Sequence, residues 1–267
     1  MSEILAPCGA MESLTAAVNA GADAVYLGEE YFSARKNADN FTAEQLCDAV
    51  RFCHYSGVKV YVTLNTLVFD REIPLLAKAI ENCAKADVDA FIVQDMGVAR
   101  LARQIVPELP LHASTQMTVN SPEGAIMAKE LGFTRVVLGR ELSLAQIKAI
   151  TESCDIETEL FVHGALCVCI SGQCYMSSVL GGRSGNRGLC AQPCRLDFTS
   201  GDRHNILSLK DLSLTEKLPE LAKAGITSFK IEGRMKKPEY VAGVVSMYRK
   251  YVDLYLSGKK YKVEEQD

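Results

Sequence analysis

Short apolar segments recur along the whole chain, and each ends in a polar residue or glycine. They are rich in Val, Ile, Leu, Phe and Tyr without strict alternation, which is typical of parallel strands covered by helices. Eight such segments are predicted strands: residues 3–9, 21–28, 57–65, 88–95, 109–115, 132–140, 156–164 and 225–233.

Amphipathic segments with apolar residues three and four positions apart lie between these strands. The predicted helices are residues 11–21, 43–57, 73–86, 97–109, 121–132, 143–154 and, after the eighth strand, 238–258. Thr42, Ser121 before Pro122, and Ser143 are helix-start signals. Strands that alternate with helices in this way predict an α/β fold, a (β/α)8 TIM-type barrel.

A doubly wound open sheet is the rival architecture. It normally carries a glycine-rich phosphate-binding fingerprint after its first strand. The corresponding segment here, APCGAMES, has a single glycine. The barrel is therefore favoured, and residues 1–267 are predicted to form one domain.

The gap between the seventh and eighth predicted strands is much longer than the others. It holds a cysteine- and glycine-rich segment, residues 165–210, predicted to be a metal-binding insertion after strand seven. Loops that follow barrel strands lie on the C-terminal face, where active sites are found. A long loop with little secondary structure needs a reason to be ordered, and a metal centre would supply one.

Composition and charge indicate the cellular location and the kinds of partner that the protein can have. No apolar run approaches the ~20 residues of a membrane helix, and the start, MSEILAPCGA, lacks a secretory pattern. These features predict a cytoplasmic protein without a membrane partner. The net charge of −4 disfavours a dedicated nucleic-acid binder but allows a local basic face.

The insertion carries five of the chain's ten cysteines. A reducing compartment disfavours disulfides, and Cys47, Cys53 and Cys83 fall in helical patterns as small buried hydrophobes. The remaining group of cysteines suggests an iron–sulfur cluster, a zinc site or unbound thiols. Cys169 is treated as a spare, and the candidate metal ligands are Cys167, Cys174, Cys190 and Cys194.

The pattern E-x-F-x2-G-A-L-C-x4-G-x-C-x2-S, from Glu159 to Ser177, resembles the signature of the collagenase-like peptidase U32 family. The segments VTLNT, VQDMG, LHASTQ, LGRELSL, NRGLCAQPCR, LSLKDL and FKIEGR are also similar to that family. The resemblance covers nearly the whole chain. The sequence is most similar to the branch of the family that hydroxylates ribosomal-RNA cytidine. Related branches hydroxylate transfer RNA or, without oxygen, the ubiquinone ring.

The resemblance implies a 4Fe–4S cluster on Cys167, Cys174, Cys190 and Cys194, with zinc as the runner-up. It also implies hydroxylation of a pyrimidine in structured RNA, rRNA or tRNA, independently of O2 and with a prephenate-linked donor. The sequence does not identify the electron donor. RNA-modifying members are often longer, so we expect either an oligomer or a further C-terminal domain.

Polar residues at the strand ends should converge on one barrel mouth. We expect catalytic roles for His163, Glu141 and Glu232, with His163 as the acid–base candidate beside the cysteines. A histidine bonded to backbone, or arginine–carboxylate pairs that only close the barrel, would be the structural alternatives. The predicted substrate-binding residues are Arg35, Asn65, Gln94, Gln116, Arg140, Lys230 and Arg234.

A base must be splayed out of RNA to reach a barrel mouth. Basic residues near the predicted mouth would give it a positive field, unless they are ordinary surface charges; they are Arg183, Arg187, Arg195, Lys210, Arg234, Lys236 and Lys237.

Three other functions compete with RNA hydroxylation. The first is a U32-type peptidase, although the chain has neither H-E-x-x-H nor G-x-S-x-G, and a thiolate bound to iron cannot attack a carbonyl. The second is a hydroxylase of a small aromatic such as a ubiquinone precursor. The third is a zinc-bearing binding module without activity.

Overall fold

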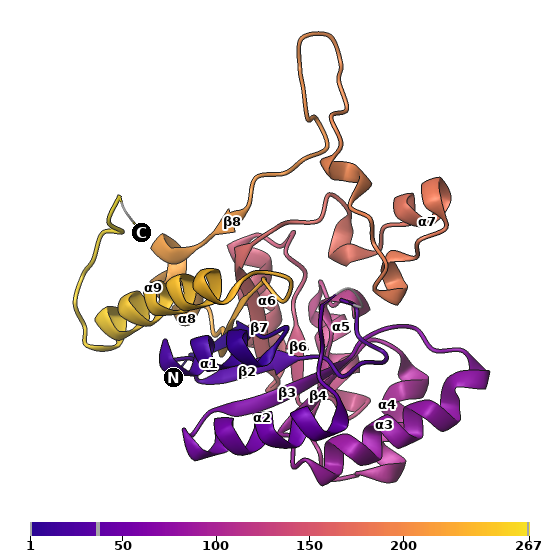
Figure 1. The fold of residues 1–267 in the computed structure, drawn as a ribbon. Coiled ribbons are helices and arrows are strands. Elements are labelled where there is room, and N and C mark those ends of the chain that lie inside the picture. Colours follow the sequence, from indigo (N-terminus) through magenta and orange to yellow (C-terminus); the bar gives the residue numbers. More distant parts are fainter. Residues whose placement is uncertain (1, 36–37, 266) are drawn as a thin grey trace.

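A computed structural model describes residues 2–35, 38–265 and 267, and Figure 1 shows the fold. Eight parallel strands form a closed barrel: β1 (Glu3–Pro7), β2 (Ala24–Leu27), β3 (Lys59–Leu64), β4 (Ala90–Val93), β5 (Leu111–Ala113), β6 (Arg135–Val137), β7 (Glu157–Gly164) and β9 (Ser228–Ile231). They pair in the order β6–β5–β4–β3–β2–β1–β9–β7, and a β6–β7 pairing closes the ring. Every strand lies within a predicted segment, so the predicted barrel is confirmed and the open sheet is excluded.

Helices surround the barrel: α1 (Met11–Asn19), α2 (Ala43–Tyr55), α3 (Ile73–Lys85), α4 (Met96–Ile105), α5 (Pro122–Glu130), α6 (Leu144–Ser153), α8 (Leu218–Lys223) and α9 (Pro238–Leu256). The predicted start signals are confirmed. Thr42 and Ser143 form capping boxes with Gln45 and Gln146, and the Ser121 side chain accepts from Gly124 N–H. None of the helices within the described ranges is both long and apolar enough to cross a bilayer.

Besides the short helices of the insertion, two short elements were not predicted. The strand β8 (Leu212–Ser213) pairs antiparallel with the end of β7, beside His163 and Gly164. The six-residue helix α8 precedes β9. Neither is long enough to show a hydrophobic period, because two strand residues or less than two helical turns contain no repeat.

The barrel interior holds paired charges as well as apolar side chains. Lys230 Nζ lies 2.7 Å from Glu159 Oε1, and both side chains are buried. Arg135 Nη1 lies 3.2 Å from Glu159 Oε2 and 2.7 Å from Glu3 Oε1, and Tyr61 donates to Glu3. Because a buried charge is tolerated only when it is paired, this network fixes its members in place, including Lys230 below the barrel mouth.

The insertion runs from the end of β7 to β8 and rises above the barrel around α7 (Met176–Gly181) in Figure 1. Hydrogen bonds tie it to the barrel loops. Ser171 N–H donates to the Glu141 carboxylate, and the Gln173 side chain donates to the Gln116 carbonyl. The segment is therefore seated on the C-terminal face, over the strand ends.

Arg187 links the insertion to the barrel. Its guanidinium forms a two-point ion pair with Glu72, at 2.8 and 2.6 Å, and lies 4.8 Å from the Phe69 ring centroid. Bidentate pairs of this kind combine charge with fixed geometry. Both side chains are only partly exposed, so the pair clamps the loop before Cys190 against the segment that follows β3.

We expect Glu72→Gln to loosen residues 183–195 without unfolding the barrel. The amide cannot carry the charge that Arg187 pairs with, and losing a charged hydrogen bond costs about 1–2 kcal/mol. The measurement is amide hydrogen exchange, where faster exchange should be confined to the insertion. Glu220→Gln, which breaks an exposed pair with Lys217, is the control; equal exchange in all three proteins would contradict the clamp.

The stability that the Arg187–Glu72 ion pair contributes should depend on pH. Arg187 lowers the pKa of Glu72 from 4.5 to about 2, chiefly through its hydrogen bonds. A lowered carboxyl pKa contributes stability above the unfolded pKa and loses it as pH falls through the folded value. Protection of the insertion should therefore be complete above about pH 5 and decline progressively toward pH 2, whereas Glu72→Gln should lack this component.

Candidate functional site

A cavity of about 180 Å³ lies at the C-terminal end of the barrel, where strand ends and insertion meet. Tyr26, Phe161 and Lys230 line it from the barrel, and Leu166, Ser171 and Gly188 line it from the insertion. Clefts for drug-sized ligands measure roughly 300–1,000 Å³. This cavity therefore suits small ligands such as a ring or a small acid, in the position where barrel enzymes hold their substrates.

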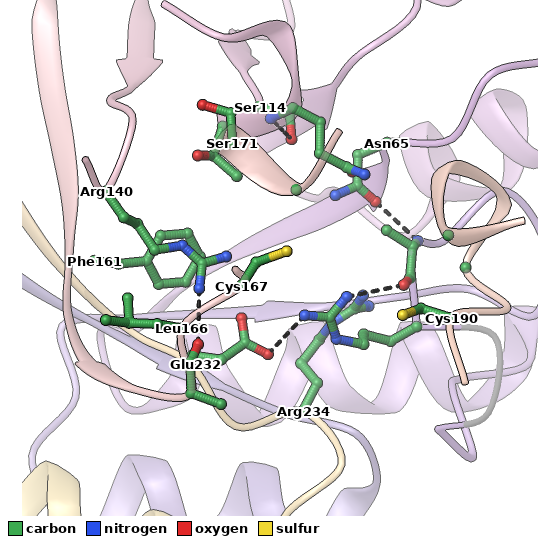
Figure 2. Close-up of a pocket in the computed structure, with 18 of the residues that line it drawn as sticks. Asn65, Ser114, Arg140, Phe161, Leu166, Cys167, Ser171, Cys190, Glu232 and Arg234 are labelled. Carbon is green, nitrogen blue, oxygen red and sulfur yellow. Dashed lines mark hydrogen bonds and ion pairs between the residues drawn. The ribbon is translucent and has the colours of Figure 1, made fainter. Parts of the chain in front are cut away.

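Most predicted site residues meet at this cavity, and Figure 2 shows part of the arrangement. They come from segments far apart in the chain, as expected for strand ends of a barrel. The predicted residues that line it are Arg35, Asn65, Gln116, Arg140, Lys230, Glu232, Arg234, Cys167, Cys174, Cys190 and Cys194.

His163 is not among the lining residues. Its ring lies 5.6 Å from Tyr248 and 6.0 Å from Tyr240 of α9, measured between ring centroids. An irregularity in β7 explains this position: Phe161 pairs with Lys230 but His163 pairs with Ile231, so two steps of β7 match one of β9. The bulge turns His163 to the outer face of the barrel. Burial lowers its pKa, which favours the neutral ring.

Glu141 and Gln94 also lie outside the cavity lining. Glu141 is exposed and accepts the backbone hydrogen bond from Ser171, so it supports the insertion instead of facing the cavity. Gln94 is buried behind the strand end, 8% exposed. Among other strand-end residues, Asp95 caps α4 and His112 packs edge-on against Tyr61 inside the barrel.

One side of the cavity, here called the arginine wall, consists of Arg35, Arg140, Arg234 and Glu232. Arg35 Nη2 lies 3.1 Å from Glu232 Oε1. Burial alone would raise the pKa of Glu232, but the three arginine charges outweigh burial and lower it. Glu232 is therefore an ionised carboxylate at neutral pH, and the wall carries more positive than negative charge.

Arg234 and Arg140 have no carboxylate within 4 Å among the described residues. Arg234 donates to Ser33 Oγ at 2.6 Å and to Thr63 Oγ1 at 3.0 Å, while burial lowers its pKa to about 10. Arg140 donates to the Ala165 carbonyl, with its guanidinium carbon 4.3 Å from the Phe161 ring centroid. Neither guanidinium group is paired with a carboxylate of the described residues, so both are available to an anionic ligand.

The sequence did not reveal several residues that line the cavity beside this wall or hold its arginines in place. Tyr26 and Phe161 look like ordinary core residues of their strands, and only their inward register distinguishes them. Ser33 and Thr63 hold Arg234. A clearer signal was Gly28, where an added Cβ would lie 2.5 Å from Ser33 Oγ and 2.8 Å from Arg234 Nη1. That position must stay free of a side chain for the arginine to fit.

The four candidate cysteine ligands line the same cavity, whereas Cys169 does not. All are free thiols. Burial, together with the nearby Cys167 and Cys190 thiols, raises the pKa of Cys194. Backbone N–H groups point at two of them: Met176 donates to Cys174 Sγ at 3.4 Å and Gln192 to Cys190 Sγ at 3.3 Å.

No three His, Cys, Asp or Glu side chains within the described ranges converge closely enough to hold a single metal ion. Ligands of a multi-iron cluster each bind a different iron atom, so their sulfurs stand farther apart than the ligands of one tetrahedral ion. The four thiols that line the cavity are a ligand set that a multi-iron cluster could use.

Several proteins with known names are similar in sequence to this chain. The 23S rRNA 5-hydroxycytidine C2501 synthase of Escherichia coli K12 is 43% identical over 94% of this chain and 39% of that protein. The tRNA hydroxylation protein P1 of Bacillus subtilis 168 is 40% identical over 95% of this chain and 63% of that protein. A collagenase of Porphyromonas gingivalis W83 is 37% identical, over 96% and 64%. The chain thus spans less than two thirds of each of these three relatives.

Solved structures agree on the fold. The U32 peptidase Mk0906 superimposes with a TM-score of 0.63 at 15% identity, covering 89% of this chain and 95% of that one. Phosphoribosylanthranilate isomerase of Thermotoga maritima gives 0.54 at 12% identity, over 95% and 99%. The model of peptidase family U32 matches residues 9–267. The sequence resemblance is therefore confirmed: the chain belongs to peptidase family U32.

Proposed function

We propose that this protein is an RNA-modifying enzyme that hydroxylates a pyrimidine base of rRNA or tRNA with the help of a 4Fe–4S cluster. The observation that carries the proposal is that four cysteines, three arginines and an ionised Glu232 line one small cavity at the barrel mouth. Redox chemistry and anion binding are thereby brought within reach of a single ring-sized ligand.

The RNA substrate is supported by relatives whose names include rRNA and tRNA modification. A cavity for one ring fits a nucleotide splayed out of its stack. Among the basic residues predicted at the rim, Arg187 is neutralised by Glu72 and Arg195 is held by the Leu166 carbonyl and Ser208. Lys236 and Lys237 are exposed beside Arg234 and are better placed to meet phosphates.

The cluster is supported by the cysteine set. Cys167, Cys174, Cys190 and Cys194 would hold it, with the two N–H···S bonds around them of the kind that tunes cluster potentials. When bound, such a cluster supplies one-electron redox chemistry that protein side chains cannot. Zinc remains the runner-up, because four thiolates can also hold one tetrahedral zinc ion.

The arginine wall suits a carboxylate-bearing oxygen donor. We propose a hydroxylated carboxylic acid of the prephenate class, bound by Arg140 and Arg234. The base exchanges C–H for C–OH while the donor exchanges C–OH for C–H, so an electron pair passes from base to donor and O2 is not consumed. Glu232 holds Arg35 at 3.1 Å and can accept a hydrogen bond from the reacting partner.

A peptidase is less well supported. Catalysis by a cysteine or serine nucleophile needs a base within hydrogen-bond reach. The described lining residues include cysteines and serines but no histidine, since His163 lies on the outer face of the barrel. The collagenase name of one relative does not change this geometry.

The function is tested by mass spectrometry of rRNA and tRNA from a strain that lacks the gene. We expect one pyrimidine to lose a mass corresponding to a single oxygen atom and to regain it when the full-length gene is restored. Unchanged RNA together with the loss of a hydroxylated quinone intermediate and accumulation of its precursor would instead favour the small-aromatic hydroxylase. Peptide cleavage by the iron-loaded protein, with RNA unchanged, would favour the peptidase.

We expect Cys167→Ala to abolish cluster binding, because a missing thiolate leaves one iron without a protein ligand. Iron and acid-labile sulfide per chain, counted after anaerobic purification, should fall to near zero together with the visible absorbance. Cys169→Ala is the matched control, since Cys169 lies two residues away but does not line the cavity. Equal iron in both variants would refute the ligand assignment, and zinc without sulfide in the wild type would establish the runner-up.

We expect Glu232→Gln to keep the cluster and to lower kcat for RNA hydroxylation by at least ~10-fold, because the charge that orients Arg35 and the ligand is lost. Iron content and RNA hydroxylation are measured on the same preparation. Glu239→Gln, at an exposed position at the start of α9, should behave as wild type. Full activity of Glu232→Gln would limit this carboxylate to a structural role.

A further inference from the structure

The cavity has a second side that differs chemically from the arginine wall. We call it the amide–hydroxyl wall; it consists of Asn65, Ser114, Gln116 and Ser171. Figure 2 shows Asn65, Ser114 and Ser171 on one side, Arg140, Glu232 and Arg234 on the other, and Cys167 between them. None of the four residues in this wall can carry a charge at neutral pH, so it offers only neutral donors and acceptors.

Two oxygens of this wall are buried without a partner among the described residues: Gln116 Oε1 and Ser171 Oγ. Ser171 is only 2% exposed, and its backbone is held in the left-handed region, at φ 48°, while its N–H is bonded to Glu141. An unpaired buried oxygen is costly, and so is a left-handed serine. Such costs are typical of groups that await a ligand.

The other groups in the wall are held in defined orientations. Asn65 Oδ1 accepts from Ala34 N–H at 3.0 Å, so its Nδ2 donor is the end left for a ligand. The Gln116 carbonyl accepts from the Gln173 side chain, and Gln116 N–H donates to Ser114 Oγ at 3.3 Å. The backbone that carries the Gln116 side chain is therefore fixed. The wall presents a donor from Asn65 and an acceptor from Gln116 to the same cavity.

A neutral planar ring that carries an N–H donor next to an acceptor complements this pair of groups. A carboxylate can satisfy only the donors of this wall, because it has no proton to offer Gln116 Oε1. Pyrimidine bases carry such an edge in opposite order: cytosine has a donor amino group at position 4 beside the acceptor N3, whereas uracil has an acceptor carbonyl at position 4 beside the donor N3–H. Groups held in fixed positions can therefore distinguish the two bases. Proteins read unstacked RNA bases through these edges.

We infer that the amide–hydroxyl wall binds the hydrogen-bonding edge of the target pyrimidine and determines which base is accepted. Gln116 Oε1 accepts from the base N–H, Asn65 Nδ2 donates to the adjacent acceptor, and Ser171 Oγ bonds a further edge atom. The inference rests on the proposed function and adds specificity to it. The arginine wall is thereby left to the anionic co-substrate, and the two ligands meet across the cysteines.

The test compares Gln116→Met with wild type, as cluster-loaded full chains, on matched short RNA hairpins that carry a single unpaired cytidine or uridine. Methionine fills the space but cannot accept the hydrogen bond. We expect the ratio of kcat/KM between the two pyrimidines to collapse toward 1, with a loss of ~10–100-fold on the preferred one. Iron content should not change. Gln104→Met, exposed on α4, is the matched control.

Ser171→Ala provides a second route if Gln116→Met fails to fold or loses iron. It removes the unpaired hydroxyl and should weaken binding of the preferred hairpin, measured by fluorescence anisotropy, without lowering the iron content. Wild-type selectivity retained in both variants would overturn the inference and leave the proposed function standing.

The two proposals fail in different ways. A wild-type protein that binds one pyrimidine selectively but hydroxylates neither hairpin would refute hydroxylation, while loss of that binding in Gln116→Met would still support the wall. A wild-type protein that binds both hairpins equally and turns them over at equal rates would overturn the wall alone.

Discussion

Buried charge must be compensated, and this constraint organises the protein from the barrel floor to its mouth. Inside the barrel, Glu159 meets both Lys230 and Arg135, so each ion has a partner. At the mouth the positive charges are only partly neutralised. Glu232 pairs with Arg35, whereas Arg234 is held by hydroxyl groups. The unbalanced positive charge defines the side of the cavity that suits an anion.

The barrel was predictable because its signals are local and repeated. Apolar segments, capping residues such as Thr42 and Ser143, and the long gap before the eighth strand all lie in sequence windows of a few residues. Most of the mouth followed, since polar residues after parallel strands must share one edge. The cysteine positions in the cavity agree with the set chosen from spacing and resemblance.

What could not be predicted depends on pairing between distant segments. The displacement of His163 comes from a mismatch between β7 and β9, and nothing in the residues from Glu157 to Gly164 announces it. Glu141 looked like a site carboxylate because it follows a strand, yet its partner is a backbone N–H of the insertion. Tyr26 and Phe161 face the cavity only through their register in the barrel.

The irregularity in β7 has a further consequence. Up to Phe161, β7 pairs with β9 in regular register. Beyond the irregularity, His163 and Gly164 also pair with β8. This extra residue separates the part of β7 that pairs within the barrel from the part that pairs with β8. A change in the length or shape of the segment above would consequently leave the residues below it in register around the cavity.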